Sequence, residues 1–463
     1  MDAWRVEHDL LGDKMVPSDA YYGVQTVRAM ENFVVSNIPI SQFPFFIQAL
    51  GYIKKATALA NLEYQILDPA VAKAIIEACD EIIGGKLHDQ FPVDAIQGGA
   101  GTSTNMNANE VIANRALEIM GKKRGEYKIV HPNNHVNLSQ STNDVYPTSI
   151  RLAAAWMLNA LLDELESFKQ SLEEKGKEFH DVLKMGRTQL QDAIPMTLGQ
   201  EFIAWAESVG EDIERMRIAQ TLLYEINMGA TAIGTGLNAP KGYAEVVTRH
   251  LALLTGLPLV PSRNLIKATQ DSGGFIELSG VLKRIAAKVS KICNDLRLLS
   301  SGPRAGINEI NLPPMQPGSS IMPGKVNPVI PEVVNQVAFD VIGNDLAITL
   351  AAEAGQLELN VMEPLIAFKL FTSINNLTNV LNILTNRCIT GITANKERCR
   401  EMVENSIGLV TALVPVLGYE LCSEIAKKAQ KTEGSVYRIV LEEGYLSEED
   451  LTRILSPESM LCI

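Results

Sequence analysis

The chain has 463 residues, more than a single hydrophobic core usually supports, so its length predicts two or three domains. Apolar residues make up 46% of the sequence, which is enough to fill those cores. The net charge of −13 argues against binding to nucleic acid or to an anionic membrane surface, because both require clustered lysine and arginine.

The cysteines and the first residues bear on the cellular compartment. Six cysteines lie scattered without a CxxC pair, which is typical of free thiols in a reducing compartment and indicates neither a disulfide framework nor a zinc site. The first ten residues include several charged side chains and therefore do not form the apolar run of a secretion signal. The most apolar long stretch, 333–350, is interrupted by polar residues and does not fit a membrane span. We therefore expect a cytoplasmic protein.

The N-terminal part is expected to begin irregularly and then become helical. Residues 1–30 contain glycine and proline breaks, whereas helical periodicity covers about 46–79 and 106–121. Between these helices lies Gly98-Gly-Ala-Gly-Thr-Ser103, whose glycines let the backbone approach a ligand before Thr102 opens a helix. A threonine at a helix start is also an ordinary N-cap, so this motif alone is a weak signal.

The central part is dominated by long helices. A polar cluster, Ser139-Gln-Ser-Thr-Asn-Asp144, precedes a helix over about 148–182 that carries one apolar stripe. Such a helix is about 50 Å long, which fits a bundle better than a small globular domain. A turn at Gly186-Arg-Thr-Gln189 follows it. Further helices are expected over the ranges 197–227, 278–299 and 331–362, with others after 229–242 and after Pro364.

Strand-like alternation is almost absent, so the fold class is all-α. From about residue 390 the helices become shorter and more charged. We expect three domains: a mixed, mostly helical domain over 1–140, a helical bundle over 141–393, and a small helical domain over 394–463.

The stretch Pro317–Pro328 interrupts the helical pattern between two apolar segments. It is dense in glycine and proline, so it cannot be a helix interior or a central strand. Within it Ser319, Ser320, Lys325 and Asn327 bring together two hydroxyls, one ammonium and one amide, which suit a carboxylate. A solvated linker is the alternative that this composition alone would favour.

Residues 318–328, GSSIMPGKVNP, resemble the signature of the aspartase/fumarase superfamily of elimination lyases. The resemblance extends from about residue 5 to the C-terminus through five more blocks: Asp19–Thr26, Gln97–Ser103, Ser139–Asp144, Gly186–Asp192 and Gly234–Asn238. It implies a three-part helical fold whose central long-helix bundle forms a 20-helix core in a homotetramer. It also implies active sites shared between subunits.

The resemblance implies reversible anti-elimination of ammonia from L-aspartate to give fumarate. No motif in the sequence indicates a cofactor. The base would be Ser319, with its pKa lowered by backbone amides and a nearby cation, and an aci-carboxylate intermediate would form. The remaining site residues fall into three groups by their expected partner on the substrate. The hydroxyls of Thr102, Ser141, Thr142 and Ser320 would surround the carboxylate next to the acidic carbon, Lys325 and Asn327 would hold the other carboxylate, and Asn143, Thr188 and Gln189 would face the amino group.

Two of these positions carry alternatives. At the position of Arg28 the family resemblance implies binding of a substrate carboxylate, and a structural ion pair is the other interpretation. In the Gly186–Asp192 block many fumarases of the superfamily, and some aspartases, have histidine. Gln189 leaves this site without a titrating imidazole there, which makes a histidine-assisted water mechanism less natural and favours the aspartase branch. The histidines do not support a metal site, because His131 and His135 enclose Pro132 and lack the HExxH pattern.

Other functions stay open at this point. A fumarase or another dicarboxylate lyase would share the same clusters. A non-catalytic scaffold, as in lens delta-crystallins on a related lyase fold, would be free to lose site residues, whereas this chain retains them.

Overall fold

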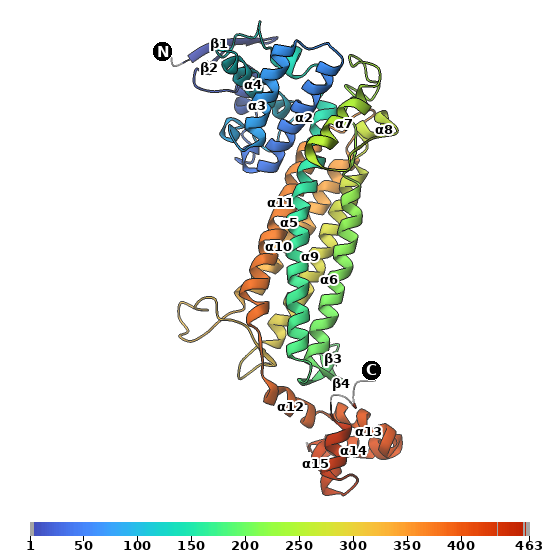
Figure 1. Ribbon diagram of the computed structural model, residues 1–463. Helices are drawn as coiled ribbons and strands as arrows, with labels where there is room; N and C mark the ends of the chain where they lie inside the picture. The colour runs from blue at the N-terminus through green and yellow to red at the C-terminus, as the bar shows by residue number, and fades with distance from the viewer. Residues whose placement is uncertain (1–3, 433, 457–458, 460–463) are drawn as a thin grey trace. The chain divides into compact units, whose positions relative to one another are not determined.

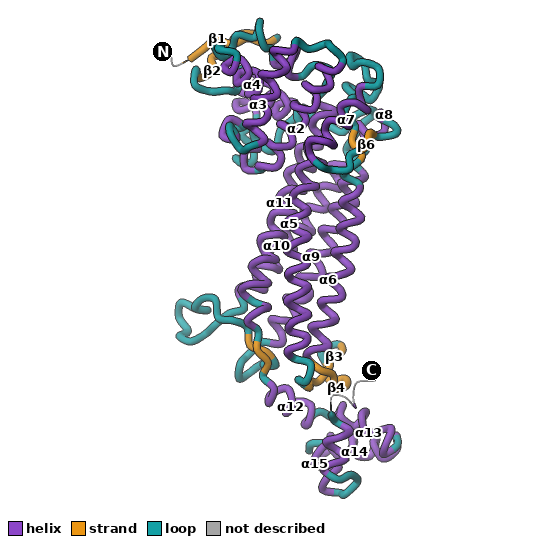
Figure 2. The backbone as a smooth tube through the Cα atoms, viewed as in Figure 1, coloured by secondary structure: helices purple, strands orange, loops and turns teal. Residues whose placement is uncertain are grey.

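The computed structural model describes residues 4–432, 434–456 and 459 of the chain. Most of these residues are helical, as the purple segments of Figure 2 show, and the strands form four two-stranded sheets. The predicted all-α class is therefore confirmed. Within the described residues no helix is both long and apolar enough to cross a membrane.

Five long helices carry most of the sequence between residues 142 and 387. They are α5 (Thr142–Glu178), α6 (Leu198–Thr221), α9 (Gly273–Leu299), α10 (Val329–Glu353) and α11 (Glu363–Arg387). The backbone contacts divide the chain into two units, and each unit contains a segment of every one of these helices. Unit 1 comprises the chain up to Leu162 with Glu214–Arg284 and Asp340–Asn376, and unit 2 comprises Asp163–Ile213, Ile285–Phe339 and the chain from Leu377. The predicted three-domain boundaries stay a prediction.

Besides its long-helix segments unit 1 contains six shorter helices, which gather at one end of these segments (Figure 1). These are α1 (Val24–Asn32), α2 (Pro44–Glu63), α3 (Pro69–Ile83), α4 (Thr102–Ile119), α7 (Tyr243–Thr255) and α8 (Leu265–Gln270). Polar contacts tie the long segments together here: Lys283 of α9 pairs with Asp345 of α10 at 2.6 Å, and Asn344 donates to Ser373 of α11 at 3.2 Å.

Unit 2 holds the hairpin of β3 (Leu183–Thr188) and β4 (Gln191–Thr197) and a group of short helices near the C-terminus. These helices are α12 (Lys396–Asn405), α13 (Val410–Leu417), α14 (Tyr419–Thr432), α15 (Val436–Glu442) and α16 (Glu448–Ile454). They bury a core of their own, in which Leu413, Val440 and Leu451 have no exposed surface. Two residue pairs, Ile310–Asn311 (β7) and Thr393–Ala394 (β8), form a further short sheet in this unit.

The predicted apolar stripes are confirmed. In α5 the residues Leu158, Leu161, Leu165, Phe168 and Leu172 have no exposed surface. The α9 stripe from Leu278 to Leu299 is at most 5% exposed at each predicted position. Full burial of one such side chain contributes about 1.5–3 kcal/mol, so these stripes account for much of the stability of both units.

The expectation of an irregular N-terminus was wrong. Strands β1 (Trp4–Asp9) and β2 (Gly12–Pro17) form an antiparallel hairpin, and α1 follows from Val24. The alternation in β1 is obscured because Val6 is 62% exposed while Glu7 is buried. Glu7 accepts a hydrogen bond from the backbone N–H of Val24 at 2.9 Å, so this strand caps α1.

The single helix expected over 46–79 is two helices. α2 ends at Glu63, and Gln65 then adopts a left-handed φ of 58°. Asp68 begins α3 by accepting from the backbone N–H groups of Ala70 and Val71 at 2.8 and 3.1 Å. An Asp-Pro pair is a helix-start signal, and here it outweighs the continuous apolar composition.

The crossing of α5 and α6 in unit 2 generates a stability prediction. A Cβ added at Gly199 would lie 2.4 Å from the carbonyl oxygen of Gly176 and 2.8 Å from the Cα of His180, both of which are backbone atoms. Gly199→Ala should therefore lower the free energy of unfolding by about 1–3 kcal/mol, measured by urea denaturation.

The matched control for this prediction is Gly210→Ala on the same helix. There the new Cβ would meet only the flexible end of Lys169 at 3.4 Å. It should stabilise the helix by up to about 1 kcal/mol. Equal effects of the two substitutions would contradict the close crossing.

Candidate active site

In unit 1 the start of α4 presses against the start of α5. Gly99, Ala100 and Gly101 have left-handed φ angles of 84°, 56° and 87° and lead directly into α4. A Cβ on Gly101 would lie 2.2 Å from the ring of Tyr146, so only glycine allows this approach. Thr102, the first residue of α4, is exposed, and its hydroxyl donates to the carbonyl of Gly99 at 2.8 Å.

Ser141, Thr142 and Asn143 open α5 next to this turn. Thr142 Oγ1 accepts a hydrogen bond at 3.1 Å from Asn105 of α4, which joins the two helix starts. Asn143 donates through Nδ2 to the carbonyl of Ala232 at 2.7 Å, and no donor to its Oδ1 is present among the described residues. The amide oxygen is thus the part of Asn143 available to accept from an ammonium group.

Asp144 holds the start of α5 in place from its buried side. Its buried carboxylate accepts from the backbone N–H groups of Ser141 at 3.0 Å, Gly229 at 3.2 Å and Thr231 at 3.0 Å. Burial raises the pKa of Asp144 to about 7, and the N–H donors and the charge of Lys54 oppose that rise. One carboxylate therefore holds the start of α5 and the loop after Ile226 together.

In unit 2 Thr188 and Gln189 lie at the turn of the β3–β4 hairpin. Thr188 pairs with Gln191, so Gln189 and Leu190 form a two-residue turn with φ angles of 55° and 62°. Turns of this kind usually contain Asn-Gly, because left-handed backbone costs other residues about 1–2 kcal/mol. Both predicted residues are exposed, and the tight turn fixes the direction of their side chains.

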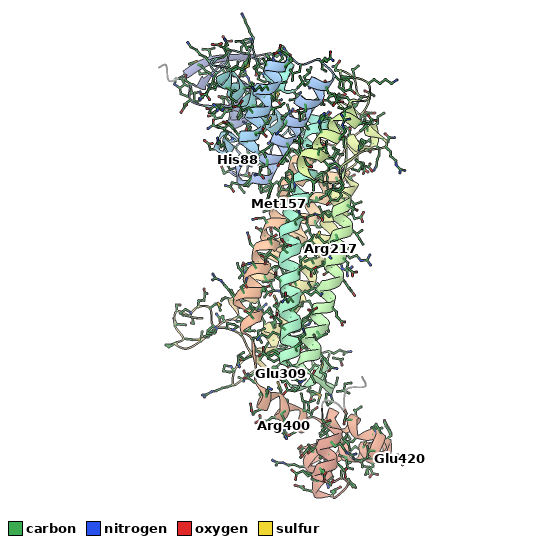
Figure 3. All side chains as sticks on the ribbon, in the orientation of Figure 1. His88, Met157, Arg217, Glu309, Arg400 and Glu420 are labelled. Atoms are coloured by element: carbon green, nitrogen blue, oxygen red, sulfur yellow. The ribbon has the colours of Figure 1, made fainter. Side chains whose placement is uncertain are left out.

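A buried ion-pair network supports this hairpin (Figure 3 labels Glu309). Glu309 has no exposed surface and meets Arg187 at 2.6 Å and Lys184 at 2.9 Å. Lys184 also meets Glu201 at 2.6 Å. Burial alone would lower the pKa of Lys184, but the two carboxylates outweigh burial and hold its pKa above the ordinary value.

The Pro317–Pro328 stretch is a loop in unit 2, and Figure 2 shows the segment before α10 projecting away from the helices. Gly318 closes its base by donating to the carbonyl of Lys325 at 2.7 Å, and Asn327 Nδ2 donates to the carbonyl of Gly318 at 2.7 Å. Ser319 Oγ accepts from the backbone N–H groups of Ile321 at 3.2 Å and Met322 at 3.0 Å. Two aimed N–H donors stabilise an alkoxide, which supports the expected role of Ser319 as a base.

The remaining predicted residues have simpler surroundings. Ser320 and Lys325 are exposed on the loop. Arg28 of α1 forms a two-pronged ion pair with Asp9 at 2.8 and 2.9 Å and also donates to the carbonyl of Gly12. This is the structural ion pair left open by the sequence, and it lowers the pKa of Asp9. Among the described residues no group of three or more His, Cys, Asp or Glu could hold a metal ion.

The predicted site residues therefore fall into two groups, one in each unit. Unit 1 brings together Thr102, Ser141, Thr142 and Asn143, and unit 2 carries the hairpin pair and the loop residues. Sequence reasoning missed Lys54 and Asn105, which lie directly behind the unit 1 group. The available signal was a lysine on the apolar face of α2, four and seven positions after Leu50 and Ile47 on the same buried side.

Comparisons with known proteins identify the families and relatives that this chain resembles. A family described as lyase matches residues 12–343, and one described as fumarase C C-terminus matches residues 409–462. The chain is similar to an aspartate ammonia-lyase of Pseudomonas aeruginosa, with 61% identity over 99% of this chain and 97% of the relative. An aspartate ammonia-lyase of Escherichia coli is 56% identical over 99% of this chain and 96% of the relative.

Solved structures agree with the sequence relatives. A Brucella melitensis protein described as fumarate lyase:delta crystallin, in a cobalt-bound form, superposes with a TM-score of 0.96 at 52% identity, covering 99% of both chains. A class II fumarase of Schistosoma mansoni superposes with a TM-score of 0.92 at 35% identity, again over 99% of both chains. The matched family, the relatives and the solved structures define a lyase with a mainly helical fold. The chain belongs to the aspartase/fumarase superfamily.

The buried network under the hairpin generates a second stability prediction. Glu309→Gln would leave Lys184 and Arg187 facing a neutral amide, so the free energy of unfolding should fall by about 3–5 kcal/mol in chemical denaturation. Glu404→Gln is the control, because the Arg400–Glu404 pair has side chains 72% and 35% exposed and should contribute less than about 1 kcal/mol. A similar loss in both variants would contradict the supporting role of Glu309.

Proposed function

We propose that this chain catalyses the reversible anti-elimination of ammonia from L-aspartate to give fumarate. The observation that carries the proposal is its 55–61% identity, over nearly the whole chain, to relatives named aspartate ammonia-lyase. The chain is accordingly a carbon–nitrogen lyase. Gln189 supports the same conclusion, because it places no titrating imidazole on the hairpin.

The proposed reaction begins with removal of a proton from C3 of aspartate by Ser319. The electrons of the broken C–H bond move into the neighbouring carboxylate, which becomes a dianionic aci-carboxylate. Donors aimed at its oxygens lower the energy of this intermediate, and the hydroxyls of Thr102, Ser141, Thr142 and Ser320 are the proposed donors. Thr102 donates to the intermediate only when its hydrogen bond to the carbonyl of Gly99 opens. The electrons then form the C2–C3 double bond as ammonia leaves from C2.

The other ends of the substrate have their own proposed partners. Lys325 supplies charge to the C1 carboxylate, and Asn327 supplies direction, since its Nδ2 uses one proton on Gly318 and retains a second. Asn143, Thr188 and Gln189 accept from the amino group through their side-chain oxygens. Arg28 keeps its proposed part in carboxylate binding only if its ion pair with Asp9 opens.

The proposed assembly is a homotetramer whose sites combine residues from different copies of the chain. Helix α10 supports self-association, because Phe339, Leu346 and Leu350 lie on one face and are 63%, 61% and 60% exposed. The proposed location is the cytoplasm. The five described cysteines are free and buried, which is compatible with a reducing compartment.

The proposal predicts substrate specificity that a spectrophotometric assay can measure. Fumarate should form from L-aspartate at mildly alkaline pH, detected by its ultraviolet absorbance, and should not form from L-malate under the same conditions. Ser319→Ala should lower kcat for aspartate by about 10²–10⁴-fold, whereas Ser167→Ala on the exposed surface of α5 should not.

The malate arm addresses the second candidate function, which the similarity to a class II fumarase favours. Fumarate from malate alone would make the chain a fumarase and would show that Gln189 does not decide the substrate. Activity with neither substrate would contradict the proposed function.

A further inference from the structure

Lys54 is a lysine with no exposed surface that lies in α2 behind the starts of α4 and α5. Its ammonium group donates to three amide oxygens: Asn105 at 2.7 Å, Asn137 at 3.0 Å and Gln140 at 2.8 Å. Three donors and three acceptors satisfy the ammonium completely. No carboxylate within the described residues pairs with it directly, so burying this charge costs several kcal/mol that an apolar residue would avoid.

The hydrogen bonds of Lys54 determine which way the Asn105 amide points. An ammonium has no lone pair, so only the oxygen of Asn105 can face it. The Nδ2 group of Asn105 must then point the other way, where it donates to Asn137 Oδ1 and to Thr142 Oγ1, both at 3.1 Å. The usual ambiguity between oxygen and nitrogen in an asparagine is removed by this contact.

The orientation of the Asn105 amide determines the role of the Thr142 hydroxyl. Because Thr142 Oγ1 already accepts from Asn105, its own proton is left to donate elsewhere. Thr142 is 9% exposed at the start of α5, beside the hydroxyls proposed to surround the substrate carboxylate. Lys54 and Asn137 thus hold Asn105 in the orientation that makes Thr142 Oγ1 an acceptor from Asn105 and leaves the Thr142 proton for an anion.

We infer that Lys54 is a positioning residue, which acts through Asn105 to keep Thr142 a hydrogen-bond donor toward the substrate carboxylate. This inference rests on the proposed function. The charged and titratable groups that influence Lys54 are Asp144 of α5 and Cys79 of α3. Burial raises the pKa of the Cys79 thiol far above its usual range, so Cys79 stays neutral. Burial lowers the pKa of Lys54 and the charge of Asp144 opposes that fall, while three amide oxygens accept the three protons of its ammonium form.

The test is a double-mutant cycle between positions 54 and 142, with kcat and KM measured for each variant. Lys54→Met frees the Asn105 amide to rotate, and it should lower kcat about 10²-fold with KM changed less than about threefold. Thr142→Val removes the hydroxyl at equal volume and should cause a similar loss. The double variant should be no slower than Thr142→Val alone, because Lys54 then has no hydroxyl to direct. Multiplied losses, or an unchanged kcat in Lys54→Met, would overturn the inference.

Asn105→Asp gives a second test that does not depend on how Lys54→Met folds. The new carboxylate keeps a partner for Lys54, so the thermal unfolding temperature should be maintained or raised. It presents only acceptors, so the Thr142 hydroxyl would donate to it and not to the substrate, and kcat should again fall about 10²-fold. Wild-type kcat in this variant would overturn the inference.

The wild-type assay separates this inference from the proposed function. The cycle uses whichever of L-aspartate and L-malate the wild-type chain converts. An active wild-type chain with additive variants overturns the role of Lys54 alone. A wild-type chain inactive on both substrates overturns the proposed function and the inference together.

Discussion

The candidate site depends on buried polar groups that hold two helix starts in place. Asp144 accepts three backbone N–H groups from the start of α5 and from the loop at Gly229–Thr231. Lys54 satisfies three amide oxygens behind the same helix start. Each group is costly to bury, and each is matched by hydrogen bonds to the backbone or to amide oxygens around the helix starts. The positions of the exposed site residues are therefore determined by hydrogen bonds that are themselves buried.

Backbone strain marks three positions: the turn before α4, the β3–β4 turn and the loop that Asp144 holds. Ala100, Gln189 and Thr231 are non-glycine residues with left-handed φ angles of 56°, 55° and 56°. Such conformations cost about 1–3 kcal/mol each and persist where the surrounding structure determines them. Here the determinants are visible: Tyr146 blocks any side chain at Gly101 after Ala100, and the β3–β4 register fixes Gln189. Rigid placement before the substrate arrives is what the proposed elimination requires.

Much of the fold could be predicted from the sequence, because a long helix with one apolar stripe must bury that stripe against other helices. The heptad-like spacing in α5 and α9 requires burial on one side of a long helix, and both stripes are buried. The N-terminal hairpin could not be predicted, because its strands are short and Val6 faces solvent while Glu7 faces the interior. The split between α2 and α3 was readable in Asp68-Pro69, but the apolar composition on both sides concealed it. Lys54 was hidden for the opposite reason, since lysine is the residue least expected on a buried face.

The most direct measurement is the activity of mixed assemblies made from Ser319→Ala and Thr188→Ala chains, which tests the proposed homotetramer with shared sites. If each site takes Ser319 and Thr188 from different copies, random mixing leaves about a quarter of the sites with both residues intact. Denaturing and renaturing the two inactive variants together should then restore about a quarter of wild-type aspartate deamination. Restoration to no more than the activity of either variant alone would contradict sites that are shared between copies of the chain.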